Sequence, residues 1–279
     1  MNIDERLSKI KWREKFGFEC YGVKIAIRID DSNLRRKMEE VLPRISRICD
    51  YGEPKHIVSL VVNADEESNG LYYNDEIAME FGRLKDSLWE YIGEKILLVL
   101  AMNSLPSKFY IHAGAVGWND FGILLPGTSR AGKTTLTRDF IKAGADYFSD
   151  DCVILDDKGY LFPFPRPLAV RTESGDRHIR EAEYYGAKTA ADKMKLKLIL
   201  FAQFEENCEW SPEPVTRGQG IMELMNNFYI KSSIGLTPGE IISSLNEISG
   251  RVEIYRGKRS DTQSVIEWVF EKFGSEFAI

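Results

Sequence analysis

The residues best suited to chemistry lie between positions 127 and 135, where the chain fits the pattern G-x-x-x-x-G-K-[ST] without a mismatch. Glycines let such a loop curl so that its N–H groups point at a nucleotide phosphate, and the following helix offers its positive end to the same charge. Lys133 would reach the outer phosphates, and the Thr134 hydroxyl would ligate magnesium. The predicted cofactor-binding residues are Gly127, Thr128, Ser129, Arg130, Ala131, Gly132, Lys133, Thr134 and Thr135.

This pattern predicts Mg²⁺ and a nucleotide as cofactors. ATP is the expected nucleotide and GTP is not excluded, because the loop reads phosphates rather than bases. The alternative is a glycine-rich turn that joins a strand to a helix. The surrounding sequence favours phosphate binding, since the apolar segment 121–126 predicts a buried strand and the segment 134–143 an amphipathic helix that ends before Gly144.

An acidic pair, Asp150 and Asp151, is the second candidate for chemistry, because Asp150 follows Lys133 by seventeen residues, enough for one helix and one turn. In phosphoryl transfer one carboxylate usually holds magnesium and another accepts the proton of the attacking hydroxyl. Neighbouring residues of a regular strand point in opposite directions, so the two aspartates are expected to have different roles. The alternative is the solvated entrance of a strand.

His112 is the third candidate, because its predicted strand leads through a hairpin to the glycine-rich loop. We expect it to bond Asp150 and so to tune a general base. The alternative is a core histidine whose hydrogen bonds are satisfied within the strand.

These candidates require an α/β fold with two parts, a small α+β domain over 1–107 and a catalytic domain over 108–279. In the first part we expect strands at 21–29 and 56–62, helices at 34–48 and 89–102, and a polar loop at 63–73. In the second we expect a hairpin of 109–117 and 121–125, a strand at 146–155, a turn at 156–159, an extended loop at 162–167, a strand at 197–202 and a helix at 264–273.

Composition limits the choice of partners. The chain has 279 residues, of which 43% are hydrophobic, and a net charge of -6 without a basic stripe. It therefore predicts neither a nucleic-acid partner nor, in the absence of a bilayer-length apolar run, a membrane protein. The four cysteines lie far apart and no export signal is visible, which indicates the cytoplasm.

Three segments together resemble the C-terminal catalytic domain of the HPr kinase/phosphorylase family: His112-Ala-Gly-Ala-Val, the loop from Gly127, and Gly144-Ala-Asp-Tyr-Phe-Ser-Asp-Asp. The resemblance covers about residues 108–175 well and the remainder loosely. It implies a P-loop fold related to the phosphoenolpyruvate carboxykinases and a kinase that, like that family, transfers phosphate to a serine hydroxyl of a small protein. It also implies a homo-oligomer, since hexamers are typical of that family.

By this resemblance Asp150 is the general base, Asp151 assists Thr134 in holding magnesium, and Lys133 and His112 complete the catalytic set. Arg130 stands where family members have glycine, and the family's Glu-Ile-Arg-Gly-type stretch after the acidic pair is missing. The chain looks closer to divergent HPr-kinase-like proteins, some of which modify ribosomal peptide precursors. Further candidates for a phosphate or substrate contact are Arg171 and Arg217, although a surface arginine at position 217 is equally consistent with the sequence.

The leading hypothesis is therefore a kinase that uses ATP and Mg²⁺ to phosphorylate a serine or threonine hydroxyl of a peptide or small protein, which the first domain presents. A kinase of a small hydroxylated metabolite would need the same residues. A nucleotide-binding regulatory module that makes no phosphorylated product would not need the acidic pair, because binding alone requires no base.

Overall fold

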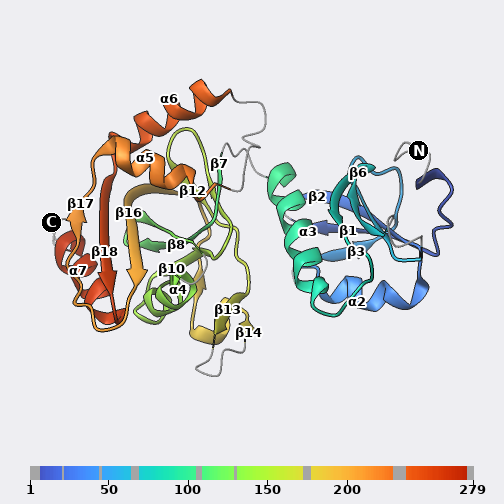
Figure 1. Ribbon diagram of the computed structural model, residues 1–279, viewed down its shortest axis with the longest axis horizontal. Helices are drawn as coiled ribbons and strands as arrows, with labels where there is room; N and C mark the ends of the chain where they lie inside the picture. The colour runs from blue at the N-terminus through green and yellow to red at the C-terminus, as the bar shows by residue number, and fades with distance from the viewer. Residues whose placement is uncertain are drawn as a thin grey trace. The chain divides into compact units, whose positions relative to one another are not determined.

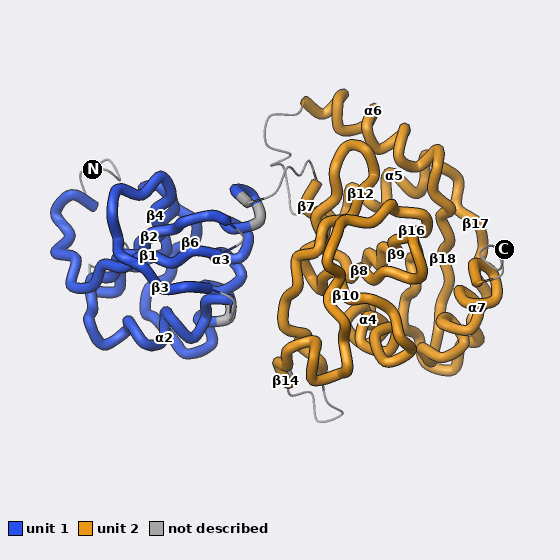
Figure 2. The backbone as a smooth tube through the Cα atoms, turned by 180° about the vertical axis from the view of Figure 1, so that it is seen from behind, with its two compact units in different colours: residues 1–105 blue, residues 106–279 orange. Residues whose placement is uncertain are grey.

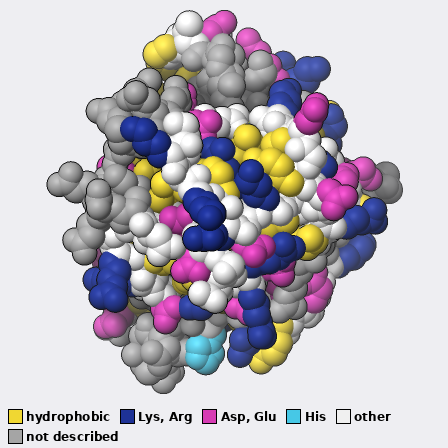
Figure 3. Space-filling view, turned by 90° about the vertical axis from the view of Figure 1, so that its right-hand side faces the viewer, with side chains coloured by type: hydrophobic (Ala, Val, Ile, Leu, Met, Phe, Trp, Pro, Cys, Tyr) yellow, Lys and Arg dark blue, Asp and Glu magenta, His cyan; other side chains and the backbone are white. Residues whose placement is uncertain are grey.

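The structure is a computed structural model that describes residues 7–20, 22–43, 46–63, 69–104, 109–128, 131–171, 177–228 and 237–274. The chain forms two compact units, Met1–Leu105 and Pro106–Ile279, each with its own mixture of helices and strands (Figure 2). On the face shown in Figure 3, acidic and basic side chains are interspersed. Among the described residues, no helix has the length and apolar character needed to span a membrane.

Unit 1 contains a six-stranded sheet in the order β3-β1-β2-β4-β5-β6. Its elements are β1 (Glu14–Cys20), β2 (Val23–Ile29), η1 (Ser32–Leu34), α2 (Arg35–Glu40), β3 (Arg47–Cys49), β4 (Ile57–Val61), β5 (Gly70–Tyr73), β6 (Glu76–Glu80) and α3 (Leu88–Ser104). Helix α3 buries Ile92, Ile96 and Leu100 against Ile25 and Ile27 of β2 in one apolar core. The helix expected at 89–102 is confirmed.

Two expectations for this unit were wrong. The helix expected at 34–48 ends at Glu40, and Arg47–Cys49 pairs with β1 as the edge strand β3. The loop expected at 63–73 contains strand β5, which is held between β4 and β6. In both cases pairing with other strands outweighed the local sequence pattern.

Unit 2 contains a ten-stranded sheet, in the order β15-β10-β8-β9-β16-β12-β11-β7, with β18 and β17 continuing from β16 (Figure 1). Its elements are β7 (Phe109–Ile111), β8 (Ala113–Trp118), β9 (Phe121–Pro126), α4 (Lys133–Lys142), β10 (Asp146–Ser149), β11 (Val153–Leu155), β12 (Tyr160–Phe162), β13 (Leu168–Arg171), β14 (Arg177–Arg180), η3 (Ala182–Tyr185), β15 (Lys188–Thr189), β16 (Met194–Phe204), β17 (Glu213–Pro214), α5 (Arg217–Met225), α6 (Pro238–Ser249), β18 (Glu253–Arg259) and α7 (Gln263–Gly274).

The central strands of unit 2 are covered on both faces, which explains why β8 and β9 are almost uninterrupted apolar runs. On one face, α4 and α7 pack through Leu136, Phe140 and Val269. On the other, α5 and α6 share a core with β7, β11 and β12. The expected hairpins are confirmed, with Asn119 and Gly159 in left-handed conformations at their turns.

Two expected strands are broken at the same level of the sheet, and this break positions the site. His112 separates β7 from β8, and residues 150–152 separate β10 from β11. Strand β8 pairs with β10, and β7 pairs with β11, with Ile111 opposite Val153. The break in one strand therefore lies beside the break in the other, which brings His112 next to the acidic pair.

Candidate functional site

The glycine-rich loop joins the end of β9 to the start of α4. Gly132 has a φ of 79°, a left-handed conformation that glycine adopts without strain, and α4 begins at the next residue. The loop is fixed to β16, because the Phe204 N–H donates to the Ala131 carbonyl over 3.1 Å. Ser129 and Arg130 lie outside the described residues.

Lys133 folds back over this loop. Its Nζ donates to the Thr128 carbonyl oxygen over 3.2 Å, and only 8% of the residue is exposed. Burial lowers the pKa of Lys133, and the negative charges of Asp151 and Asp150 oppose that effect. A buried ammonium bonded to a carbonyl can exchange that partner for a phosphate oxygen without being desolvated again.

Asp150 lies directly beside the start of α4. The Thr134 Oγ1 hydroxyl donates to its Oδ2 over 2.8 Å, although the residue is only 1% exposed. Its other oxygen, Oδ1, is buried and has no hydrogen-bond partner in the part of the chain that the structure describes. Gly114 of β8 leaves room here, since a Cβ at that position would lie 2.1 Å from Thr137 Oγ1 and 3.6 Å from Asp150 Oδ1.

The two aspartates have opposite electrostatic properties. Burial, reinforced by the charge of Asp151, raises the pKa of Asp150 to about 7, and the Thr134 hydrogen bond only partly opposes this. Burial also acts to raise the pKa of Asp151, but the hydrogen bond from His112 and the charges of Arg166 and Lys133 lower it to about 2. The site therefore combines one carboxyl that titrates near neutrality with one that stays ionised.

The backbone conformation at Asp151 gives the two neighbouring carboxyls their different surroundings. Asp151 has a φ of 65°, which is uncommon for a residue other than glycine, and the Cys152 N–H donates to the Asp150 carbonyl over 2.9 Å. The acidic pair thus lies in a tight turn rather than in the regular strand expected. Such strained conformations concentrate at functional sites.

His112 contacts Asp151, whereas the sequence analysis expected it to contact Asp150. Its Nε2 lies 3.4 Å from Asp151 Oδ1, and its backbone N–H donates to the Asn227 carbonyl over 2.6 Å. This correction follows from the broken strands, because the turn at Asp151 directs that side chain toward the break beside His112. Asn227, which lies two residues beyond the end of α5, is therefore a positioning residue that the sequence did not reveal.

Arg166 is another residue that the sequence analysis missed. It lies in the extended segment between β12 and β13, and its positive charge acts to lower the pKa of Asp150, Asp151 and Cys152. The Tyr147 hydroxyl fixes this segment by donating to the Arg166 carbonyl over 2.6 Å. An arginine between two prolines was the available signal, since such a segment returns the chain across the sheet without forming a helix.

The two remaining arginine candidates do not join this cluster in the described structure. Arg217 begins α5 and is exposed, and its guanidinium donates to the Gly250 carbonyl over 3.4 Å. Arg171 ends β13, and its side chain lies outside the described residues. Thr135 lies in the first turn of α4 and is half buried.

A cavity of about 650 Å³ lies on the β16 side of the loop, whereas the acidic pair follows β10, on the β8 side of β9. It is bounded by the start of the loop, the last residues of β16 and β18, and the end of α5. Its lining residues include Thr128, Ala131, Gln203, Asn226 and Lys258. Cavities at the carboxyl ends of parallel strands are common ligand sites, and this volume suits a small molecule.

The residues beside the loop are suited to a magnesium ion. The Thr134 hydroxyl donates its proton to Asp150 and so keeps oxygen lone pairs for a cation. Asp150 and Asp151 add hard carboxylate oxygens, one of which is buried without a donor. No group of three or more His, Cys, Asp and Glu side chains within the described ranges could hold a metal, but magnesium commonly needs only one or two carboxylates together with substrate phosphates.

Comparison with known proteins finds similarity in structure but not in sequence. No protein-family model and no curated protein matches the chain. Among solved structures, the chain is similar to the Hpr(Ser) kinase/phosphatase from Coxiella burnetii, with 12% sequence identity and a TM-score of 0.32. The similarity covers 58% of this chain and 95% of that chain. A TM-score this low supports no functional conclusion.

Proposed function

We propose that the protein is a phosphotransferase of the P-loop type, which uses ATP and Mg²⁺ to phosphorylate a hydroxyl group. One observation carries the proposal: a buried carboxyl, Asp150, is bonded to Thr134 at the start of α4 and keeps its second oxygen without a donor. A protein that only bound a nucleotide would have no need of such a group. A general base works best when its pKa lies near the working pH, and the pKa of Asp150 is about 7.

In the proposed reaction the acceptor oxygen attacks the γ-phosphorus while its proton passes to Asp150. The bond between the γ-phosphorus and the β-γ bridging oxygen breaks, and the nucleoside diphosphate leaves. Lys133 and the N–H groups of the loop would stabilise the charge on the transferring group. Magnesium, held by Thr134 and Asp151, would supply further positive charge when bound.

The orientation of the nucleotide follows from the positions of Asp150 and of the cavity, which lie on different sides of the loop. The γ-phosphate must face Asp150 for transfer, so the nucleoside would extend to the opposite side, where the cavity at the ends of β16 and β18 lies. Side-chain amides of Gln203 and Asn226 line that cavity and can donate to or accept from a purine base. An acceptor would approach from the side of the acidic pair.

The acceptor class is taken from the resemblance in sequence: a serine or threonine hydroxyl of a peptide or small protein. Incubation with γ-labelled MgATP, a panel of peptides and proteins, and a matched panel of hydroxylated metabolites tests this assignment. Label should enter a peptide or protein. Label that enters only a metabolite would correct the acceptor class, and binding of MgATP without any transfer would favour the regulatory module.

The variant Asp150→Asn tests the mechanism. The amide keeps the shape and the Thr134 contact but cannot take up a proton, so transfer should fall by about 10²–10⁴-fold while MgATP binding persists. Thr137→Val is a matched control. It removes the buried Thr137 hydroxyl, which lies on the same face of α4 as Thr134 and has no hydrogen-bond partner among the described residues. Full transfer activity in the Asp150→Asn variant would exclude Asp150 as the base.

A further inference from the structure

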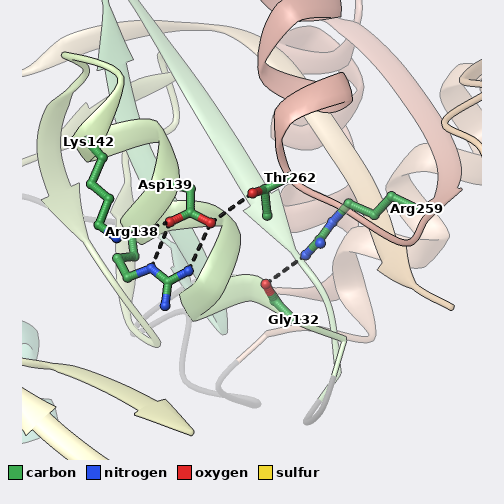
Figure 4. Close-up of polar contacts among 6 residues, drawn as sticks. All are labelled: Gly132, Arg138, Asp139, Lys142, Arg259 and Thr262. Atoms are coloured by element: carbon green, nitrogen blue, oxygen red, sulfur yellow. Dashed lines mark hydrogen bonds and ion pairs between the residues drawn. The ribbon is translucent and has the colours of Figure 1, made fainter. Parts of the chain in front are cut away.

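Arg259, the last residue of β18, lies beside Gly132 of the glycine-rich loop and is only 1% exposed. Its Nη2 donates to the Gly132 carbonyl over 2.8 Å (Figure 4). The contact joins parts of the chain that are 127 residues apart. The guanidinium also occupies the space beside Gly132, where a Cβ would lie 2.7 Å from Nη2. Arg259 and the loop are therefore packed as one unit.

The charge of Arg259 is not paired with a carboxylate in the described part of the chain. Among the described residues no Asp or Glu oxygen lies within 4.0 Å of it, and its Nε has no hydrogen-bond partner. Its only further hydrogen bond there joins Nη1 to the Asp261 carbonyl over 3.5 Å. Burial lowers the pKa of Arg259, and the more distant charges of Asp139 and Asp261 oppose this only in part.

A second arginine in the same region shows the contrast. Arg138 binds Asp139 through two guanidinium nitrogens, over 2.7 and 2.9 Å, and Thr262 donates to the same carboxylate over 2.8 Å (Figure 4). Asp139 is thus already occupied by its own partners. Arg138 completes a structural ion pair, whereas Arg259 has a carbonyl oxygen as its strongest partner.

A buried guanidinium without a counter-charge is costly, because its lost hydration is not repaid by an ion pair. The Gly132 carbonyl offers one acceptor, which it already shares with the Leu136 N–H of α4 over 3.0 Å. The fold alone therefore does not explain why arginine occupies this position. An anion that arrives in front of the loop would provide the missing charge.

The geometry indicates how Arg259 acts on such an anion. The Gly132 carbonyl belongs to the same peptide unit as the Lys133 N–H, which is the first N–H of α4. A cation bonded to the carbonyl polarises that peptide unit and makes its N–H a stronger donor. It also holds the left-handed conformation of Gly132, which directs the loop.

We propose that Arg259 is a phosphate-positioning residue, whose buried charge finds its counter-charge in the phosphate groups of a nucleotide bound at the glycine-rich loop. The inference rests on phosphate binding in the proposed function but does not depend on phosphoryl transfer. It adds a second cation, besides Lys133, to the residues that would bind the phosphates, and it makes the end of β18 part of that binding site.

The test compares Arg259→Met with the wild-type protein in two measurements, the Kd for MgATP and for inorganic tripolyphosphate, and thermal unfolding without ligand. Methionine keeps much of the volume and removes the charge. Both Kd values should rise at least about tenfold, while the unfolding temperature of the ligand-free protein should stay the same or rise, since removal of an unpaired buried charge is not destabilising. Arg259→Lys, which keeps the positive charge but lacks the planar guanidinium with its several N–H donors, should bind both ligands with intermediate affinity.

Arg138→Met is the matched control. It removes a guanidinium of the same region that has a carboxylate partner, so it should lower the unfolding temperature and leave both Kd values unchanged. Unchanged Kd values in Arg259→Met, or failure of that variant to fold, would overturn the proposal by showing a purely structural role. If the wild-type protein bound neither MgATP nor tripolyphosphate, the proposed function itself would fail, and the variants would not be needed to show it.

Discussion

Two buried aspartates, Asp30 in unit 1 and Asp150 in unit 2, occupy equivalent positions and have different surroundings. Each directly follows a strand, β2 or β10, and they are 8% and 1% exposed, respectively. Asp30 accepts hydrogen bonds from the N–H groups of Val62 and Asn63 over 3.0 and 2.9 Å, one on each carboxylate oxygen. Asp150 accepts one bond from Thr134, and its other oxygen has no partner among the described residues.

The difference shows what distinguishes a structural carboxyl from a reactive one. Burial raises the pKa of both groups. At Asp30 two backbone N–H groups oppose this effect, and each carboxylate oxygen already accepts a hydrogen bond. A neighbouring aspartate reinforces the effect at both positions, but Asp31 is the weakest of the influences on Asp30, whereas Asp151 is the largest influence on Asp150 after burial. Buried polar atoms are almost always satisfied, so an unsatisfied oxygen beside a predicted phosphate-binding loop marks a group kept available for a ligand or a proton.

Among changes to the partners of these two carboxyls, the largest effect is expected when Thr134, the described donor to Asp150, loses its hydroxyl. Thr134→Val deletes the hydroxyl that bonds Asp150 and would ligate magnesium, so phosphoryl transfer should fall by about 10²–10³-fold. Thr134→Ser, which keeps a hydroxyl, should retain most of the activity. Rates of transfer at saturating MgATP provide the measurement. A Thr134→Val enzyme as fast as Thr134→Ser would remove the functional distinction between Asp150 and Asp30.

The next effect concerns stability and pH in the absence of divalent cations. Asp150 has a folded-state pKa of about 7 against 3.8 for the ordinary group, so its contribution to stability is complete below about pH 4 and is lost as the pH rises through 7. Asp151 has a lowered pKa, and its contribution is lost only as the pH falls toward 2. Urea unfolding of the wild type should therefore show decreasing stability across this window, by about 1.4 kcal/mol per pH unit at most for this group.

Asp150→Asn should flatten that decrease, because the asparagine does not titrate. His178→Gln, which changes an exposed residue of β14, is the control and should leave the slope unchanged. If the unfolding free energy of Asp150→Asn decreased with pH as steeply as that of the wild type, Asp150 would already be ionised at pH 5, as a fully hydrogen-bonded carboxylate would be.

A smaller effect is expected at Asp30. Asp30→Asn replaces one acceptor oxygen with an amide that cannot accept from a backbone N–H, so it should cost about 1–3 kcal/mol of unfolding free energy. Transfer by the folded variant should be unchanged. Chemical unfolding at neutral pH, together with the transfer rate, would check both statements. A loss of transfer without a loss of stability would place Asp30 in an unexpected functional role.

The sequence revealed the parts of the site that depend on near neighbours. The hairpin before the loop, the helix after it and Gly144, with a φ of 103° at the end of that helix, follow from local patterns. The broken strands at His112 and Asp151 were not predictable, because they require two distant segments to break at the same level. Arg166 and Arg259 also reach the site from remote positions in the chain, and a single sequence carries no pairing information for them.

The smallest effect is expected at His112, because it acts on the partner that stays ionised. His112→Leu, whose side chain has no hydrogen-bond donor, removes the strongest of the influences that lower the pKa of Asp151, so that pKa should rise, while Arg166 and Lys133 continue to hold it down. Transfer should fall about tenfold or less, with the loss concentrated at low pH, where Asp151 would begin to protonate. The pH profile of kcat provides the measurement. A loss at all pH values as large as that of Thr134→Val would instead mean that His112 contacts the reacting groups directly, and the division of roles between the two aspartates would have to include it.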